Sequence, residues 1–378
     1  MSRSAGEGAT GRGAIAAARR VVIKMGSAVL TGGGDTLDRA YMVDAAAQYA
    51  SARAAGREVI LVSSGAVAAG LATARLARRP TDVAEQQAAA AAGQPLLMAH
   101  WHDAFSVRKT PVGQVLLGRD DFDSRDRFLN IRNCISCLLR FGVVPIINEN
   151  DTVATEEISL GDNDVLAAKL ATAVRADALV ILSTAGGVMD DTGRIVAEAP
   201  EPEALASFVR EGMSGQGRGG MRTKLEAARI ASRIGIPTVI APGRPAEVIG
   251  AVLRGETVGT LVNAGLGRHA GRRSWIALSA TPVGTLDVDA GAAAALLERG
   301  ASLLAKGVRA VEGRFDVGDV VLVRDPEGRE VARGLTNFSA DELRTVKGRD
   351  SREFGEILGR QAHAEVIHRD NLAVTARP

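Results

Sequence analysis

Five short apolar runs recur along the first half of the chain and are separated by stretches of helical or polar character. They lie at Val21–Ile23, Glu58–Val62, Val112–Leu117, Val143–Ile147 and Ala178–Leu182. Apolar runs of this length without polar alternation are typical of strands buried on both faces. The pattern therefore predicts an α/β fold, a three-layer sandwich in which helices cover both faces of a mostly parallel central sheet.

Small and polar residues follow four of these runs. The segments are Lys24-Met25-Gly26-Ser27, Ser63-Ser64-Gly65, Asn148-Glu149-Asn150-Asp151 and Ser183-Thr184. In open parallel sheets, ligands bind beyond the carboxyl ends of the strands. Packing alone does not explain polar residues at so many strand ends, so we expect a ligand site at this edge.

The pattern changes near residue 265. A segment rich in Gly and Arg reads as a linker, and beyond it lie a helical stretch, Asp289–Gly300, and two strand-like runs, Asp319–Arg324 and Glu330–Gly334. The turn Asp325-Pro326-Glu327-Gly328 joins these two runs and indicates a hairpin. The expected organisation is a disordered tail, an α/β domain, a linker, a small β-rich domain and a second tail, at residues 1–19, 20–264, 265–273, 274–371 and 372–378.

Composition narrows the class of protein without changing this picture. The chain has 378 residues, 46 Lys+Arg against 44 Asp+Glu, and 46% hydrophobic residues. These values are ordinary for a globular protein and argue against disorder. No apolar run approaches the length of about 18 residues that a membrane span requires. Residues 2–19 lack the apolar core of a signal peptide, so we expect a cytoplasmic protein.

The two cysteines, Cys134 and Cys137, have Cys-x-x-Cys spacing. One such pair supplies only two of the four ligands of a structural zinc site, and no histidine has matching spacing. The surrounding run has helical periodicity, so we expect both thiols to pack as inert groups on or beside an apolar helix face.

Two segments carry cations that suit phosphate binding. Lys24 follows the first run, and Gly26 permits close approach of the backbone to a ligand. The segment Ser214–Lys224 is rich in Gly and leads into a helix with Arg218, Arg222 and Lys224. Neither is a Walker A motif. The alternatives are an exposed surface lysine for the first and a flexible linker for the second.

Two further segments suit a small charged substrate. Ser64-Gly65-Ala66 opens a helix after a strand, where free N–H groups favour a carboxylate, although a capped tight turn would look the same. The strings at 148–151 and 161–164 place seven Asp, Asn and Glu side chains within 17 residues. Their spacing excludes an EF-hand. We interpret them as a pocket that binds a substrate ammonium and orients nearby lysines; an exposed acidic loop is the alternative.

In this order, the motifs resemble members of the amino acid kinase family that phosphorylate glutamate. The resemblance covers nearly the whole chain, and its final part is similar to the PUA domain that many bacterial members carry. The strings that carry the resemblance in the first domain are Val22–Ser27, Val62–Ala66, Val144–Asp151, Gly161–Asp164 and Gly217–Lys224, and those in the second are Leu303-Leu304-x-Lys306-Gly307 and His368-Arg369-Asp370.

The resemblance implies phosphoryl transfer from ATP to the γ-carboxylate of L-glutamate, the first step of proline synthesis. It implies that Lys24 and Lys224 flank the transferred group and that Asp164 holds both ammonium groups. It places glutamate on Ser64, Gly65, Ala66, Asp151 and Asn163. The implied ATP contacts are Lys24, Gly26, Ser27, Ser183, Thr184, Arg218, Gly219, Gly220, Met221, Arg222, Thr223 and Lys224.

The same resemblance implies that Mg²⁺ reaches the site bound to ATP, without a metal site on the protein. It also implies a homo-oligomer, with proline as a feedback inhibitor, although Ser159 replaces a basic residue found in some relatives. The chain departs from the family pattern after the fifth run. Thr184 stands where an Asp is usual and Met189 where a Tyr is usual, so the contacts to adenine are open.

Two alternatives have to be weighed against this activity. Another carboxylate kinase of the same family would share the fold and Lys24, but the two acidic strings and the PUA-like part argue against it. An RNA-binding or RNA-modifying protein is the second alternative, because PUA domains often bind RNA. Residues 274–378 contain 14 Lys+Arg and 16 Asp+Glu, a net charge of −2, so they show no electrostatic footprint for RNA.

Overall fold

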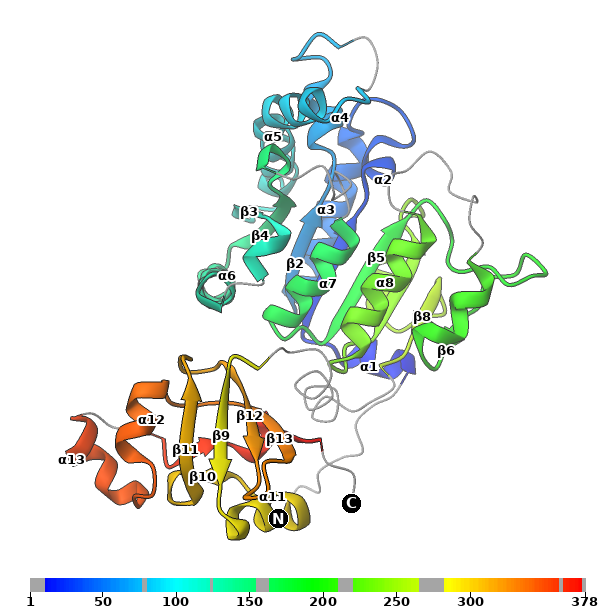
Figure 1. Cartoon of the computed structure of the whole chain (residues 1–378). Helices are drawn as coiled ribbons and strands as arrows, with labels where there is room; N and C mark the ends of the chain where they lie inside the picture. The colour runs from blue at the N-terminus through cyan, green and yellow to red at the C-terminus, as the bar shows by residue number, and fades with distance from the viewer. Residues whose placement is uncertain are drawn as a thin grey trace. The chain divides into compact units, whose positions relative to one another are not determined.

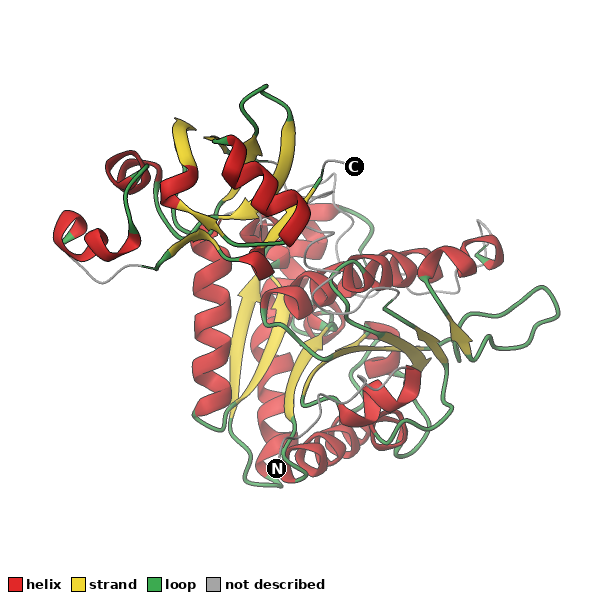
Figure 2. Ribbon diagram, turned by 90° about the horizontal axis from the view of Figure 1, so that it is seen from below, coloured by secondary structure: helices red, strands yellow, loops and turns green. Residues whose placement is uncertain are grey.

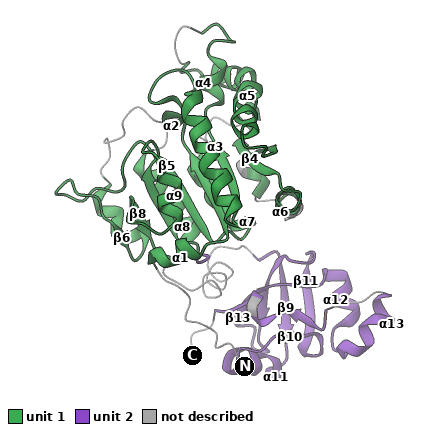
Figure 3. Cartoon of the chain, turned by 180° about the vertical axis from the view of Figure 1, so that it is seen from behind, with its two compact units in different colours: residues 1–232, 236–265 green, residues 233–235, 266–378 purple. Residues whose placement is uncertain are grey.

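The structure is a computed structural model that describes residues 11–76, 80–122, 125–153, 163–209, 220–264, 282–359 and 363–375. The chain divides into two compact units (Figure 3). The first contains Met1–Ser232 and Ile236–Gly265, and the second contains Arg233–Gly235 and Leu266–Pro378. Each unit has its own apolar core. The expected linker at 265–273 lies outside the described residues.

The first unit is built on an eight-stranded sheet, with strand order β3-β4-β2-β1-β5-β7-β8-β6 (Figure 1). Neighbours from β3 to β7 pair in parallel, whereas β8 runs antiparallel to β7. The predicted mostly parallel sheet is therefore confirmed. The strands are β1 (Arg20–Met25), β2 (Glu58–Ser63), β3 (Val112–Leu117), β4 (Val144–Glu149), β5 (Ala178–Ser183), β6 (Glu198–Ala199), β7 (Thr238–Pro242) and β8 (Thr260–Val262).

Helices cover both faces of this sheet, and Figure 2 shows strands lying between them. One face packs against α1 (Gly11–Ala17), α3 (Arg39–Ala54), α5 (Val83–Ser106) and α9 (Val248–Leu253). On the other face, α7 (Asn163–Ala173) contacts β1 and β5, and α8 (Met221–Ser232) packs beside α7. The remaining helices are α2 (Ser27–Thr31), α4 (Ala66–Gly70), α6 (Arg125–Arg140) and the short 3₁₀ helices η1 (Arg119–Phe122), η2 (Asp151–Val153) and η3 (Pro202–Phe208).

The alternation of side chains along β1 decides where its lysine lies. Successive residues of a strand point to opposite faces of the sheet. Val21, Ile23 and Met25 belong to the core beneath α3, α5 and α9. Lys24 therefore points to the face that α7 and α8 cover.

The N-terminal segment differs from the expected disordered tail, because residues 11–17 form helix α1. Ile15 is fully buried in the core of the first unit. The guanidinium of Arg12 donates to the backbone carbonyls of residues 197, 256, 258 and 259. Arg57 donates to the carbonyls of Ala16 and Ala18 at the other end of the helix. One apolar side chain and two arginines thus fix a segment whose composition alone suggests disorder.

The expectation that both cysteines pack on or beside the apolar helix face is wrong for Cys134. α6 forms as predicted, but Cys134 is exposed and Cys137 is only partly buried. The buried face carries Ile131 and Ile135. Adjacent helical residues are about 100° apart, so Cys134 turns away from the face that Ile135 occupies.

The second unit is β-rich, as expected. Its larger sheet has the strand order β11-β9-β12-β13-β15, and β10 pairs with β14. The predicted hairpin is present, with Asp325 accepting from the backbone N–H groups of Glu327 and Arg329 in its turn. The elements are β9 (Gly284–Val288), α11 (Ala290–Arg299), β10 (Leu303–Leu304), η4 (Ala305–Gly307), β11 (Val308–Gly313), β12 (Val320–Arg324), β13 (Glu330–Leu335), α12 (Ala340–Val346), η5 (Ser351–Glu353), α13 (Phe354–Leu358), β14 (Glu365–Ile367), η6 (Arg369–Asn371) and β15 (Leu372–Val374).

β15 lies within the segment expected to be a C-terminal tail. It pairs antiparallel with β13, and Leu372 and Ala373 are buried. A strand of three residues has too little periodicity to be recognised in the sequence, and only its partner strand defines it. None of the helices described in either unit is long and apolar enough to cross a membrane.

Candidate active site

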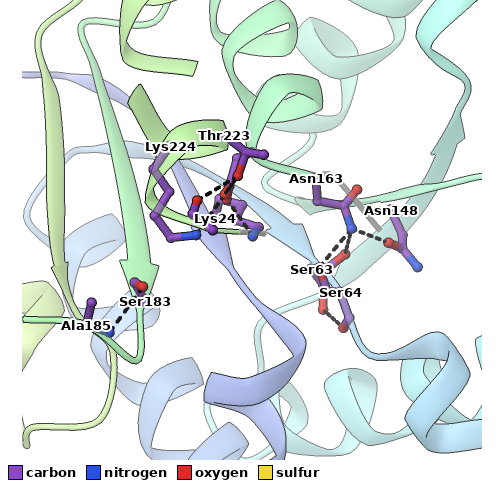
Figure 4. Close-up of polar contacts among 11 residues, drawn as sticks. Lys24, Ser63, Ser64, Asn148, Asn163, Ser183, Ala185, Thr223 and Lys224 are labelled. Atoms are coloured by element: carbon purple, nitrogen blue, oxygen red, sulfur yellow. Dashed lines mark hydrogen bonds and ion pairs between the residues drawn. The ribbon is translucent and has the colours of Figure 1, made fainter. Parts of the chain in front are cut away.

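The carboxyl ends of the central strands bring the expected polar residues to one edge of the sheet. β1 pairs in register with β2 and β5, so Met25 lies opposite both Ser63 and Leu182. β4 follows β2 in the sheet. Figure 4 shows three groups of polar side chains along this edge: the lysines in the middle, Asn163 and Asn148 with Ser63 and Ser64 on one side, and Ser183 on the other.

The middle group is a buried charge cluster of Lys24, Lys224 and Asp164. Lys24 Nζ lies 2.5 Å from Asp164 Oδ1, and Lys224 Nζ lies 2.9 Å from Asp164 Oδ2. Thr223 Oγ1 also donates to Asp164 Oδ2 at 3.0 Å. The relative exposures of Lys24, Lys224 and Asp164 are 4%, 5% and 0%. The cluster joins the end of β1 to the first turns of α7 and α8.

The electrostatics of this cluster fit an anionic ligand. Burial acts to raise the pKa of Asp164, but the charges of Lys24 and Lys224 and their hydrogen bonds lower this pKa from 3.8 to about 2. Asp164 is therefore ionised at neutral pH. The side chains of Lys24, Lys224 and Asp164 together carry a formal charge of +1. Buried positive charge of this kind favours an anion such as phosphate.

Gly26 leaves room beside the cluster. A Cβ at this position would lie 3.4 Å from Lys24 Nζ. Gly26 is also the N-cap of α2, which begins at Ser27. A side chain at this position of the β1–α2 turn would therefore begin in contact with the Lys24 ammonium group.

The second group is a chain of neutral amides and hydroxyls. Asn163 Nδ2 donates to Ser64 Oγ at 2.9 Å and to Asn148 Oδ1 at 3.0 Å. Asn148 Nδ2 in turn donates to Gln94 Oε1 at 2.8 Å. On the opposite face of β2, Trp101 Nε1 donates to Ser63 Oγ at 2.9 Å. Neighbouring residues of α7, Asn163 and Asp164, thus belong to different groups.

The turn between β2 and α4 requires glycine at position 65. Gly65 has φ of +108° and is the N-cap of α4, and a Cβ there would lie 3.1 Å from the side chain of Leu37. Both the backbone conformation and the crowding disfavour any other residue. The turn holds the backbone of Gly65 and Ala66 beside Ser64, at the edge where the amide chain lies.

Comparison with known proteins identifies the family. The model of the amino acid kinase family matches residues 19–242, and the model of the PUA domain matches residues 284–358. A glutamate 5-kinase of Thermus thermophilus is 46% identical over 363 residues, which cover 94% of this chain and 97% of that protein. A glutamate 5-kinase of Stutzerimonas stutzeri is 46% identical over 368 residues, which cover 96% of this chain and 99% of that protein. The chain belongs to the glutamate 5-kinase family.

The family membership, the kinase fold and the PUA domain expected from the sequence are therefore confirmed. The structure also brings together three of the residues expected to serve a glutamate 5-kinase in catalysis, namely Lys24, Lys224 and Asp164. Ser64 and Asn163, expected at the glutamate site, are joined by a hydrogen bond. These placements agree with the roles expected from the sequence, and the roles themselves are taken up as proposals below.

The other predicted site residues that the structure describes belong to neither the charge cluster nor the amide chain. Asp151 begins η2, which packs against α5, and it is partly exposed. Ser183 ends β5 and accepts from the backbone N–H of Ala185 at 3.2 Å, whereas Thr184 is exposed. At the start of α8, the carbonyl oxygen of Gly220 lies 3.0 Å from Thr223 Oγ1 and competes with Asp164 for its single proton. Met221 is partly buried and Arg222 is exposed. Arg218, Gly219 and Ser159 lie outside the described residues.

Gln94 and Trp101 take part in this edge although no motif in the sequence marks them. Both lie on α5, whose sequence is rich in alanine and carries no charge pattern. Gln94 stands between Gly93 and Pro95, and that interruption of an apolar helix was the only available signal. In the part of the chain that the structure describes, no group of three or more His, Cys, Asp or Glu could hold a metal ion.

Proposed function

We propose that the chain transfers the γ-phosphoryl group of ATP to the γ-carboxylate of L-glutamate, giving L-glutamyl 5-phosphate and ADP as the first step of proline synthesis. The observation that carries the proposal is the buried Lys24–Asp164–Lys224 cluster beside a chain of neutral amides, at one edge of an amino acid kinase fold. The names of the relatives, glutamate 5-kinases at 46% identity, support the choice of acceptor.

The acceptor needs no catalytic base, because a γ-carboxylate has a pKa near 4.3 and is already ionised at neutral pH. Phosphoryl transfer then depends on alignment and on charge stabilisation at the transferred oxygens. Lys24 and Lys224 supply that stabilisation from opposite sides of the transferred group. Asp164 holds both ammonium groups in place before the substrates arrive, so their ordering costs nothing during the reaction.

Glutamate lies over β2 and β4, next to the lysine cluster. Ser64 and Asn163 face it, and the backbone N–H groups of Gly65 and Ala66 contact a carboxylate at the start of α4. Asp151 contributes a negative charge for the substrate ammonium. These assignments follow from the position of each residue along the strand edge.

ATP lies on the other side of the cluster, toward β5 and α8. Ser183, Thr184 and the first turn of α8 line this side, together with Gly26 and Ser27 after β1. Both oxygens of Asp164, the carboxylate of the cluster, are held by lysines or by Thr223. The cluster thus leaves no carboxylate oxygen for a resident metal, which fits Mg²⁺ that arrives with the phosphates of ATP.

The proposal also includes three further expectations from the sequence. The protein acts in the cytoplasm as a homo-oligomer, and proline inhibits it near the glutamate site. Sedimentation of the purified chain tests the oligomer, and glutamate titrations with and without proline test the inhibition. Competitive inhibition by proline supports the overlap of the two sites, and inhibition that glutamate does not relieve contradicts it.

Trapping with hydroxylamine tests the reaction directly, because hydroxylamine converts an acyl phosphate into a hydroxamate. The purified chain is incubated with Mg-ATP and with L-glutamate, N-acetyl-L-glutamate or L-aspartate in parallel. Hydroxamate should form with L-glutamate and depend on ATP. Formation only with N-acetylglutamate or aspartate would assign another carboxylate kinase activity. Omission of ATP is the control for chemical background.

A further inference from the structure

Gln94 is held at the glutamate side of the sheet edge by a close crossing of two helices. In α5, a Cβ on Gly93 would lie 1.9 Å from the carbonyl oxygen of Ala66 and 2.3 Å from the backbone nitrogen of Gly70. The backbones of α5 and α4 are therefore in direct contact. This contact fixes the next residue, Gln94, beside the turn that carries Gly65 and Ala66.

The hydrogen bonds determine which atom of the Gln94 amide meets Asn148. Asn148 Oδ1 accepts from the backbone N–H of Glu149 at 2.9 Å, so this atom must be oxygen. The other atom of the Asn148 amide is then the donor Nδ2, and the atom of Gln94 that it meets must be the acceptor Oε1. The backbone N–H of Glu149 thus determines the orientation of the Asn148 amide and, through it, of the Gln94 amide. Gln94 Nε2 is then a donor at the end of the chain.

Two residues of the amide chain, Gln94 and Asn163, each carry a buried polar atom that has no hydrogen-bond partner among the described residues. One is the donor Gln94 Nε2, and the other is the acceptor Asn163 Oδ1. A buried polar atom without a partner costs about 1–3 kcal/mol, so such atoms in a native structure point to a ligand or water. In the charge cluster next to them, Asp164 Oδ1 also lacks a hydrogen bond of ordinary geometry, but it is ion-paired with Lys24 Nζ.

The two atoms match the α-end of an amino acid in chemical type. A donor suits a carboxylate, and an acceptor suits an ammonium group. Neighbouring strands are about 4.8 Å apart, so β4, which carries Asn148 in the middle of the amide chain, lies roughly 10 Å from β1 with Lys24. A glutamate whose γ-carboxylate lies at the lysine cluster would therefore direct its other end toward the amides.

We propose that Gln94 Nε2 donates a hydrogen bond to the α-carboxylate of glutamate, while Asn163 Oδ1 accepts one from the α-ammonium group. The inference rests on the proposed function and adds a residue that selects substrates by their α-carboxylate. Gln94 acts in substrate recognition and takes no part in phosphoryl transfer.

Gln94→Glu tests the contact with almost no change in shape. The substitution keeps an acceptor for Asn148 Nδ2 but replaces the donor Nε2 with an anionic oxygen, which repels a carboxylate. The substrates are L-glutamate and its α-amide, which keeps the γ-carboxylate and replaces the α-carboxylate with a donor. The ratio of kcat/KM for glutamate to that for the α-amide should fall at least tenfold, with KM for ATP unchanged. For an analogue turned over too slowly, its Ki against glutamate gives the same ratio.

Two further variants separate recognition from structure. Gln94→Met removes both hydrogen bonds without adding charge, and should lower the preference for glutamate less than Gln94→Glu does. Gln114→Glu adds the same charge at an exposed position of β3 and should leave the preference unchanged. An unchanged preference in Gln94→Glu, or equal losses with both substrates, would overturn the role of Gln94. If the unmodified chain forms no hydroxamate from glutamate, the proposed function fails instead.

Discussion

The charge cluster and the amide chain lie side by side at the same strand edge, but they differ in how many of their polar atoms have a partner within the protein. In the charge cluster, Asp164 binds Lys24 and Lys224 internally before any ligand is present. In the amide chain, Asn148 satisfies its neighbours but leaves buried atoms of Asn163 and Gln94 without partners. The charged groups of the cluster are paired with one another, whereas two atoms of the amide chain have no hydrogen-bond partner among the described residues.

The difference follows from what each group has to do. A buried lysine without a counter-charge is unstable, so a cluster that stabilises a transferred phosphoryl group must be balanced in advance. Neutral amides can stay partly unpaired at a cost of about 1–3 kcal/mol for each atom, and a substrate then recovers that cost on binding. Turnover should therefore depend on the first group and specificity on the second.

Removing the shared carboxylate should cause the largest change. Asp164→Ala leaves two buried ammonium groups without their partner, and breaking a buried ion pair costs about 3–5 kcal/mol of unfolding free energy. Urea denaturation measures it. Asp341→Ala, which breaks an exposed pair with Arg344, is the control and should cost less than about 1 kcal/mol. Equal costs in both variants would remove the distinction between a balanced buried cluster and an ordinary ion pair.

Removing one lysine should lower turnover more than binding. Lys24→Ala and Lys224→Ala each delete transition-state charge, and loss of one such donor typically lowers kcat about 10²- to 10³-fold. Steady-state release of ADP measures kcat, and circular dichroism checks the fold. Lys347→Ala, at an exposed position of the second unit, should keep normal turnover. Near-normal kcat in either cluster variant contradicts its assigned role.

Shortening a side chain of the amide chain should mainly raise KM for glutamate. Asn163→Ala removes the donor to Ser64 and Asn148 and the free acceptor, so KM for glutamate should rise about 5- to 30-fold, equivalent to about 1–2 kcal/mol. Asp151→Ala should change KM in the same direction. Glutamate and ATP are varied separately, and KM for ATP should stay within about twofold. A larger loss in kcat than in KM would place Asn163 with the charge cluster.

Acid should destabilise the first unit through Asp164. Its pKa is lowered in the folded state, so its contribution to stability is complete above pH 3.8, and is lost as the pH falls toward 2. The contribution is on the order of 2 kcal/mol. Unfolding free energy measured at several pH values should show this slope in the unmodified chain and a smaller one in Asp164→Asn. Identical slopes would assign the acid sensitivity to other carboxylates.

The smallest effect should come from the support beneath the amide chain. Ser63→Ala removes the acceptor of the fully buried Trp101 indole, which should lower stability by about 1 kcal/mol. The glutamate and ATP kinetics should change little, because Ser63 points to the opposite face of β2. A melting curve followed by tryptophan fluorescence measures the loss. A large rise in KM for glutamate would show that Trp101 positions the site.

The sequence by itself determined the parts that depend on local order along the chain. Apolar runs predicted β1 to β5, and the residues after four of these runs predicted the edge along which Lys24, Ser64 and Ser183 lie. Parallel strands covered on both faces must be apolar throughout, and their carboxyl ends must share an edge. The hairpin around Asp325 was likewise predictable, since its turn residues are contiguous.

Tertiary structure decided what depends on contacts between distant segments. The fixed helix α1 and the pairing of β15 each depend on partners far away in sequence. Gln94 shows this most clearly, because the interruption of an alanine-rich helix by Gly93 and Pro95 does not by itself indicate a recognition residue. Only the glycine contact between α4 and α5, and the amide oriented by the backbone of Glu149, place its donor at the site.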